Sequence, residues 1–189
     1  MKRYLFIAAA FLGLSAFTFN NLWKNDPAHS QLGFTVTHLG INDVSGFFKD
    51  FTVSVESTKP DLSDAVVTLS AKATSIDTRI EARDNHLKSA DFFDAEKFPE
   101  ISFKSTGIKK AGKDAYKLSG DLTLHGITKP VVVDLLYKGK TQNPMSKKET
   151  IAFQVTGSIK RSDFKVGEKF PDGMVSDVVR IKADGEFAQ

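Results

Sequence analysis

The sequence predicts an all-β fold of eight antiparallel strands that can close into a barrel. Three observations support this. Apolar and polar residues alternate with a period of two along eight segments, turn-forming residues separate several of them, and only one segment has helical spacing. A period of two is typical of strands with one buried face. Closing eight such strands into a barrel removes the exposed edges of an open sheet.

Most of the predicted strands have apolar side chains on one face and mainly polar side chains on the other. In the clearest example, Leu118, Leu122 and Leu124 face away from Lys117 and Asp121. Turn residues at 111–114 and 126–130 separate neighbouring segments. In chain order, the predicted strands span residues 34–38, 47–55, 68–73, 101–105, 116–124, 131–137, 151–159 and 179–187.

The segment from Thr78 to Ala90 breaks the alternation and predicts a helix between the third and fourth strands. Thr78 and Glu81 have the spacing of a capping box. Ile80 and Leu87 have helical spacing, so we expect them on one face of this helix.

The predicted interior is strongly apolar and contains several small residues. The chain has 16 Phe against three Tyr and one Trp, and Phe carries no polar group. Small inward residues could leave a hollow barrel with room for a ligand. The alternative is a packed two-sheet sandwich in which small and large residues interdigitate. The small residues on the inward parity are Ala71, Ala73, Ser105, Gly120, Gly157 and Ala183.

Composition excludes several functions. The chain of 189 residues has no Cys, which excludes disulfides, thiolate metal sites, a thiol nucleophile and a lipidated N-terminal cysteine. Its formal charge is +3, and Lys2 and Arg3 supply two of these charges, so the remainder carries 3 − 2 = +1. So small a charge argues against nucleic-acid binding.

The first residues resemble an export signal. Lys2 and Arg3 precede an uncharged, mainly apolar run from Tyr4 to Phe19, which predicts a secretory signal peptide over about 1–19. This run is short for a membrane-spanning helix. Cleavage after Ala16 or Thr18 and retention as an uncleaved anchor both stay open. Residues 23–189 are predicted to form one domain.

No pattern predicts catalysis or metal binding. The four histidines, His29, His38, His86 and His125, include no pair with chelating spacing. We expect His29 and His125 to fix turns, His86 to lie on the helix, and His38 to face inward. Arg161 also has inward parity, so its charge must be paired, hydrated or in contact with a ligand head group. We therefore predict no catalytic residue and no metal site.

An ordered set of motifs resembles the YceI-like family of bacterial periplasmic proteins. The resemblance covers the whole chain after the leader, and the ordered set is far more specific than any one motif. The motifs are DPAHS at 26–30, FTVTHL at 34–39, SIDT at 75–78, RDNHLKS at 83–89, DFFD at 91–94, FPEISF at 98–103, GDLTLHGITKP at 120–130 and RSDF at 161–164.

This resemblance implies a lipocalin-like eight-stranded antiparallel barrel whose long apolar pore binds a polyisoprenoid, such as a quinone or prenyl phosphate. It implies periplasmic or secreted location, a lipid ligand rather than a cofactor, and no enzymatic activity. A homodimer and transient membrane contact for lipid exchange are compatible with it. The chain departs from the family pattern at Lys165, where members often have Gly after R-x-D-F, which puts the local turn in doubt.

The ligand would lie against the inward side chains, and Phe92 and Phe93 would cover one end or pack the helix onto the barrel. Burying about ten CH₂-sized groups offers ~8 kcal/mol before ordering costs, which predicts micromolar or weaker binding. A lipid- or quinone-linked enzyme and a stress-related interaction protein without a ligand are the alternatives. The predicted ligand-binding residues are Phe34, Val36, His38, Phe47, Phe51, Val53, Leu69, Phe103, Leu122, Leu124, Val133, Phe153, Val155, Arg161, Val179 and Ile181.

Overall fold

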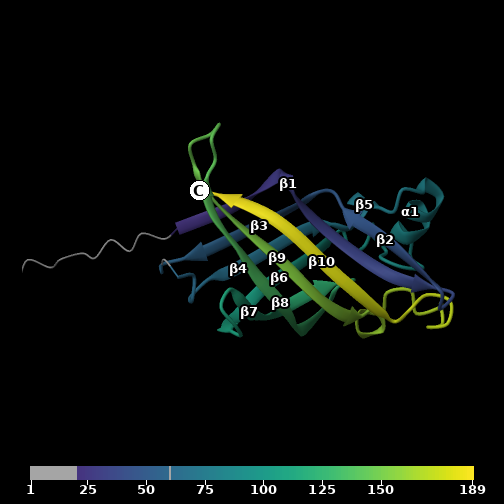
Figure 1. The fold of residues 1–189 in the computed structure, drawn as a ribbon. Coiled ribbons are helices and arrows are strands. Elements are labelled where there is room, and N and C mark those ends of the chain that lie inside the picture. The colour runs from purple at the N-terminus through teal and green to yellow at the C-terminus, as the bar shows by residue number, and fades with distance from the viewer. Residues whose placement is uncertain (1–20, 60) are drawn as a thin grey trace, which may run out of the picture.

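A computed structural model describes residues 21–59 and 61–189. The predicted signal peptide lies outside these residues. The chain winds obliquely around one axis, with α1 at one end and the C-terminus at the other (Figure 1). In chain order, the strands are β1 (Asn21–His38), β2 (Asn42–Phe48), β3 (Phe51–Ser57), β4 (Val66–Lys72), β5 (Ile76–Asp77), β6 (Glu100–Lys110), β7 (Ala115–Leu124), β8 (Ile127–Gln142), β9 (Glu149–Lys160) and β10 (Val178–Ala188).

These strands form a closed antiparallel barrel. The sheet runs β10-β9-β8-β7-β6-β4-β3-β1 and closes where β1 pairs with β10. Beyond its pairing with β3, β1 continues and pairs with β2, which in turn pairs with β5. The short strands β2 and β5 thus continue β3 and β4, respectively, past a break in each. Counted in this way, the barrel has eight strands, and the prediction from the sequence is confirmed.

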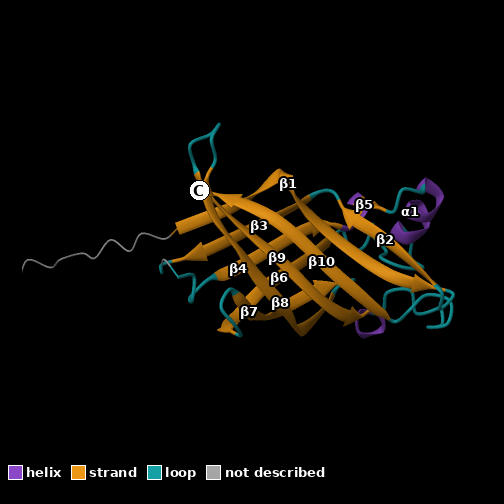
Figure 2. Cartoon of the chain, in the orientation of Figure 1, coloured by secondary structure: helices purple, strands orange, loops and turns teal. Residues whose placement is uncertain are grey.

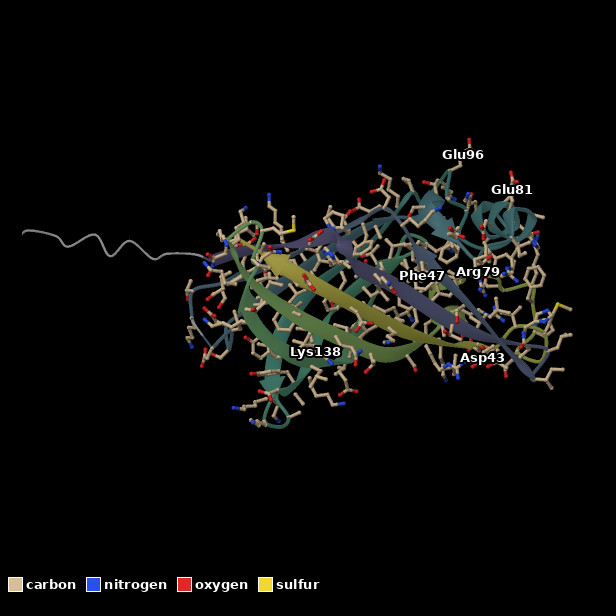
Figure 3. All side chains as sticks on the ribbon, turned by 45° about the horizontal axis from the view of Figure 1, so that its top comes forward. Asp43, Phe47, Arg79, Glu81, Glu96 and Lys138 are labelled. Carbon is tan, nitrogen blue, oxygen red and sulfur yellow. The ribbon has the colours of Figure 1, made fainter. Side chains whose placement is uncertain are left out.

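The chain breaks between β2 and β3, and the break changes which residues face inward. Odd-numbered residues face inward in β3, whereas the even-numbered Phe48 faces inward in β2. Phe48 is 9% exposed, whereas Phe47 is 42% exposed on the outer face (Figure 3). An uninterrupted strand over 47–55 would place Phe47 inside, so that prediction is wrong. The break is matched on the neighbouring strand, because Lys49 N donates to Ser75 O at 3.1 Å and Lys72 N donates to Asp50 O at 2.9 Å.

The helix is α1 (Glu81–Lys88), between the third and fourth barrel strands as predicted, and shorter than the predicted 78–90. The predicted capping box is wrong, because Ile80 occupies the N-cap without a side-chain hydrogen bond. Thr78 is instead buried beneath the helix, where its main-chain N–H and its hydroxyl both donate to Asp84 Oδ1. Arg83 Nε also donates to the Thr78 hydroxyl, at 2.7 Å.

Short 3-10 helices complete the end that carries α1 (Figure 2): η1 (Ala73–Ser75) and η2 (Arg161–Phe164). The core has two clusters. One surrounds Phe48, Ile101 and Phe164 at the α1 end, and the other surrounds Trp23, Leu118 and Phe153 toward the opposite end. No helix in the described part of the chain is long and apolar enough to cross a membrane.

Neighbouring groups occupy the space beside most of the small inward residues. A Cβ on Gly120 would lie 2.3 Å from Phe103 Cζ, and one on Gly157 would lie 2.8 Å from Val133 Cγ1. Ser105 instead accepts a hydrogen bond from Val67 N at 2.8 Å. Of the six small residues used in the prediction, Ala183 alone lines the cavity described next. The barrel is hollow, but the small residues do not create most of the space.

Candidate ligand-binding cavity

The barrel encloses a cavity of about 440 Å³, within the usual range for small-molecule sites. It extends past both core clusters, and its wall is mainly apolar. All but three of the predicted ligand-binding residues line it. The lining members are Phe34, Phe51, Val53, Leu69, Phe103, Leu122, Leu124, Val133, Phe153, Val155, Arg161, Val179 and Ile181.

The three exceptions are Val36, His38 and Phe47, which do not line the cavity. Phe47 faces outward because of the break after β2. Val36 and His38 lie beyond the last β1–β10 pair, Thr35 with Arg180, and therefore past the closed ring of strands. His38 is exposed and makes an isolated bridge with Val175.

Sequence reasoning missed the part of the wall that β1 provides before Phe34. Trp23 and Asn25 line the cavity there, although β1 was predicted to begin only at Phe34. The alternation is interrupted by a bulge, because four residues of β1 between Asn25 and Ser30 lie opposite a single residue of β10. Further lining residues outside the prediction include Leu32, Phe48, Val55, Tyr116, Leu118, Leu135, Tyr137, Ile151 and Phe187.

The cavity reaches solvent at the end opposite α1, which we call the open end. The loop residues 58–59 and 61–65, 111–114 and 143–148 lie at this end, together with the start of β1 and the end of β10 (Figure 1). Four exposed lining residues lie there: Asp61, Asp114, Lys140 and Glu149. Among the described lining residues toward α1, such as Ile101, Leu124 and Val166, the side chains are buried or half-buried.

The polar groups at the open end are partly paired with one another. Lys140 Nζ lies 2.9 Å from Glu149 Oε2, and the hydrogen bond and charge of Glu149 raise the pKa of Lys140. Tyr137 lines the cavity beside them, and burial raises the pKa of its hydroxyl. Tyr137 therefore stays neutral near neutral pH and presents a ring and a hydroxyl to the cavity.

Arg161 lies at the α1 end and is 6% exposed. Its guanidinium donates five hydrogen bonds to main-chain carbonyls, those of Val166, Gly167, Phe170, Val175 and Ser176, at 2.6 to 3.2 Å. A guanidinium has five N–H donors, so none is left for a ligand head group. The charge of Arg161 is therefore paired with main-chain carbonyls rather than with a ligand. Arg161 therefore organises the 161–177 loop, and a head group could bind it only by displacing a carbonyl.

Phe92 and Phe93 have different positions. Phe93 lines the cavity at its α1 end and meets Phe48 edge-on, with ring centroids 5.7 Å apart. Phe92 stacks on Phe170 at 4.6 Å and contacts His86 edge-on. Phe93 thus covers the end of the cavity, whereas Phe92 packs the segment after α1 against the 161–177 loop.

His29, His86 and His125, which were predicted to have structural roles, each contact a polar group of a neighbouring segment. His125 Nδ1 lies 3.1 Å from Phe164 O, and His86 lies on α1, within 3.3 Å of Asp91. His29 Nδ1 lies 2.8 Å from Asp26 Oδ2 inside the β1 bulge. That contact lowers the pKa of Asp26 and raises the pKa of His29.

One group among the described residues has the geometry of a metal-ligand set: Asp26, His29 and Glu186, whose ligand atoms lie within 4.8 Å of one another. The carboxylates are half-buried and His29 is exposed. Both Asp26 oxygens already accept hydrogen bonds, one from Ala28 N and one shared with His29. These two contacts of Asp26 hold the residues of the bulge together.

A closed antiparallel barrel around a mainly apolar cavity is the architecture of small-ligand-binding β-barrels. The chain belongs to the YceI-like domain family, whose model matches residues 23–187. It is 36% identical over 167 residues to a UPF0312 protein of Staphylococcus aureus strain MSSA476. This alignment covers 86% of this chain and 95% of that protein.

Solved structures share the fold. BcnA of Burkholderia cenocepacia matches with a TM-score of 0.77 at 26% identity, over 86% of this chain and 98% of that one. A polyisoprenoid binding domain from Saccharophagus degradans matches with a TM-score of 0.64 at 16% identity, over 88% of this chain and 97% of that one. At 16% identity, the second likeness bears on the fold alone.

Proposed function

We propose that the protein binds a long apolar lipid, a polyisoprenoid such as a quinone or prenyl phosphate, and sequesters or carries it. The observation that carries this proposal is the mainly apolar cavity, whose exposed charged residues lie at its open end. Membership of the YceI-like family supports it, and a polyisoprenoid binding domain is one of the proteins that have this fold. Each CH₂ group moved from water into the cavity contributes roughly 0.8 kcal/mol.

We further propose that this is a binding function without catalysis or a cofactor, in the periplasm after export. In support, the charged lining residues already have partners at two points: Arg161 with main-chain carbonyls and Lys140 with Glu149. A lipid- or quinone-linked enzyme and an interaction protein with an unused cavity are the competing functions.

The direct test is mass spectrometry of organic extracts from the purified protein. Ala183→Phe places a ring into the cavity and should abolish co-purification of a stoichiometric lipid. Ala152→Phe is the matched control. It adds the same ring on β9, but Ala152 lies between the lining residues Ile151 and Phe153 and its side chain points to the opposite face, away from the cavity. Equal lipid in both variants would place the lipid outside the cavity. No lipid in the wild type after reloading with isoprenoids would leave the interaction role as the better account.

We also propose that the open end contacts membranes during lipid exchange. Met145 at the tip of the β8–β9 loop is 92% exposed, and Lys147 and Lys148 follow it. An apolar side chain beside cations suits an anionic lipid surface. Sedimentation with phosphatidylglycerol vesicles should be weakened by Met145→Asp. Unchanged sedimentation of this variant would refute the contact.

A further inference from the structure

Two hydrogen-bond donors on β1 have no acceptor among the described residues. They are Trp23 Nε1 and Asn25 Nδ2, both buried and both on side chains that line the cavity. Trp23 is only 5% exposed, so bulk water does not satisfy its N–H. Buried polar groups in native proteins nearly always have a partner, so each exception calls for a physical explanation.

The orientation of the Asn25 amide is fixed by the main chain of β3. Val53 N donates to Asn25 Oδ1 at 2.7 Å, at the point where the β1–β3 ladder has ended at Lys24 and Ser54. An N–H must meet an oxygen, so the amide cannot be flipped, and its NH₂ group is the one without a partner. Asn25 thus holds β1 to β3 with its oxygen and leaves its donor at the cavity wall.

The two donors belong to one place on the wall. Residues 23 and 25 are alternate positions of β1, so both side chains face inward, about 6.6 Å apart along the strand. This part of β1 lies toward the open end, where Trp23 packs in the cluster with Val55, Ile151 and Phe187. The rest of that cluster is apolar except for two partly buried tyrosines, Tyr116 and Tyr137.

Charge near this place disfavours an anionic ligand group inside the cavity. The charged lining residues nearest to it are Asp61, Asp114, Glu149 and Lys140 at the open end and Asp184 on β10, and Lys140 is already paired with Glu149. An anion drawn inside would lose hydration and meet these carboxylates. The nearby loop lysines, Lys113, Lys147 and Lys148, do not line the cavity, so a phosphate would be held outside at the rim.

We propose that Trp23 and Asn25 form a polar subsite for a neutral hydrogen-bond acceptor, a carbonyl oxygen of the ketone, quinone or amide type, on an otherwise apolar ligand. This inference rests on the proposed lipid-binding function and specifies its ligand. Both nitrogens are covered in the ligand-free conformation, so the acceptor reaches them after small rotamer changes of the neighbouring side chains that cover them, of the kind common on binding.

The test compares three probes with similar polyene tails: geranylgeranylacetone, the acyclic C20 hydrocarbon β-springene and geranylgeranyl diphosphate. Affinity is measured by displacement of a fluorescent apolar reporter from the full chain. We expect the ketone to bind about 5- to 10-fold more tightly than the hydrocarbon for each hydrogen bond gained. Trp23→Phe removes the N–H and keeps a ring, so it should reduce this preference and leave hydrocarbon binding nearly unchanged.

Asn25→Asp is the second variant, because it keeps an oxygen for Val53 N and replaces the donor by an acceptor. It should also reduce the ketone preference, and Tyr116→Phe, at another lining position, is the control that should retain it. Equal binding of ketone and hydrocarbon by the wild type, or a preference that survives both substitutions, would overturn the subsite while lipid binding stands. Tightest binding of the diphosphate, unaffected by both variants, would overturn it in favour of the rim lysines. If no probe binds, the proposed function itself fails.

Discussion

Single residues in this barrel have functions that their type and parity do not reveal. Arg161 has the inward parity of a ligand contact, yet its five donors are used by the loop that follows it. Asn25 precedes the first predicted strand, yet its amide joins two strands and leaves a donor at the cavity. In both cases the partner is a main-chain group placed by distant parts of the fold.

Arg161→Lys should destabilise the protein. Lysine keeps the charge but has three donors, so at least two buried carbonyls lose their partner, at a cost of about 2–4 kcal/mol. For a chain of this size, Tm should fall by about 5–15 °C in a thermal melt. Arg180→Lys is the control: Arg180 is an exposed partner of Asp43, and its effect should be within about 0.5 kcal/mol. Lost lipid binding with an unchanged Tm would instead make Arg161 a ligand contact.

Asp26→Asn should lower the pKa of His29. The Asp26 hydrogen bond raises the His29 pKa above its ordinary 6.5, and the same contact lowers the Asp26 pKa below 3.8. The His29 contribution to stability is fully present below pH 6.5 and is lost as pH rises through the raised pKa. The Asp26 contribution is present above pH 3.8 and is lost as pH falls through the lowered pKa.

Histidine ring NMR signals followed against pH would measure this shift. His38, which lies on β1 away from the bulge, supplies the internal reference in the same spectra. An unchanged His29 midpoint in Asp26→Asn would show that the contact does not form in solution.

At the scale of elements, interruptions in the strands decide which side chains face the cavity. The break between β2 and β3 turns Phe48 inward and Phe47 outward, and the bulge in β1 brings Trp23 and Asn25 to the wall. The turn after η2 is another local departure, because Lys165 has φ 57° and ψ 25°, the left-handed conformation that favours glycine. Lys165 thus takes the conformation expected for the family's Gly at this position, and the turn is retained.

Lys165→Gly should therefore stabilise the protein. Removing the side chain relieves the steric cost of the left-handed conformation, partly offset by the greater freedom of glycine when unfolded, which leaves a gain of about 0.5–1 kcal/mol. Urea unfolding should show a higher midpoint with the same m-value. Lys160→Gly, five residues earlier at φ −95°, should lower the midpoint. A lower midpoint for Lys165→Gly would mean that its side chain makes a compensating contact.

At the scale of the whole molecule, the barrel combines a closed hydrogen-bonded wall with an interior that its own side chains do not fill. Phe93 covers the α1 end and polar residues surround the open end. A ligand that enters this cavity binds only the folded state, so binding and folding stability are linked.

Saturating ligand should therefore raise Tm. At a free concentration of 100 times Kd, the free energy of unfolding rises by about 2.7 kcal/mol, which corresponds to roughly 5–10 °C for a chain of this length. Geranylgeranylacetone and differential scanning fluorimetry provide the measurement, and Trp23, the one tryptophan of the chain, should report entry through its intrinsic emission. Ala183→Phe should show neither effect, whereas a shift equal to wild type would place the ligand outside the cavity.

The sequence by itself determined the number of barrel strands, the helix position and 13 of the residues that line the cavity, because alternation with a period of two reports directly on which face of a strand is buried. The tertiary structure decided the rest. It excluded Val36, His38 and Phe47, added Trp23 and Asn25, and assigned the donors of Arg161 to main-chain carbonyls. Breaks, bulges and strand closure set these positions, and they depend on pairing between segments distant in the chain. Local alternation carries no information about such pairing.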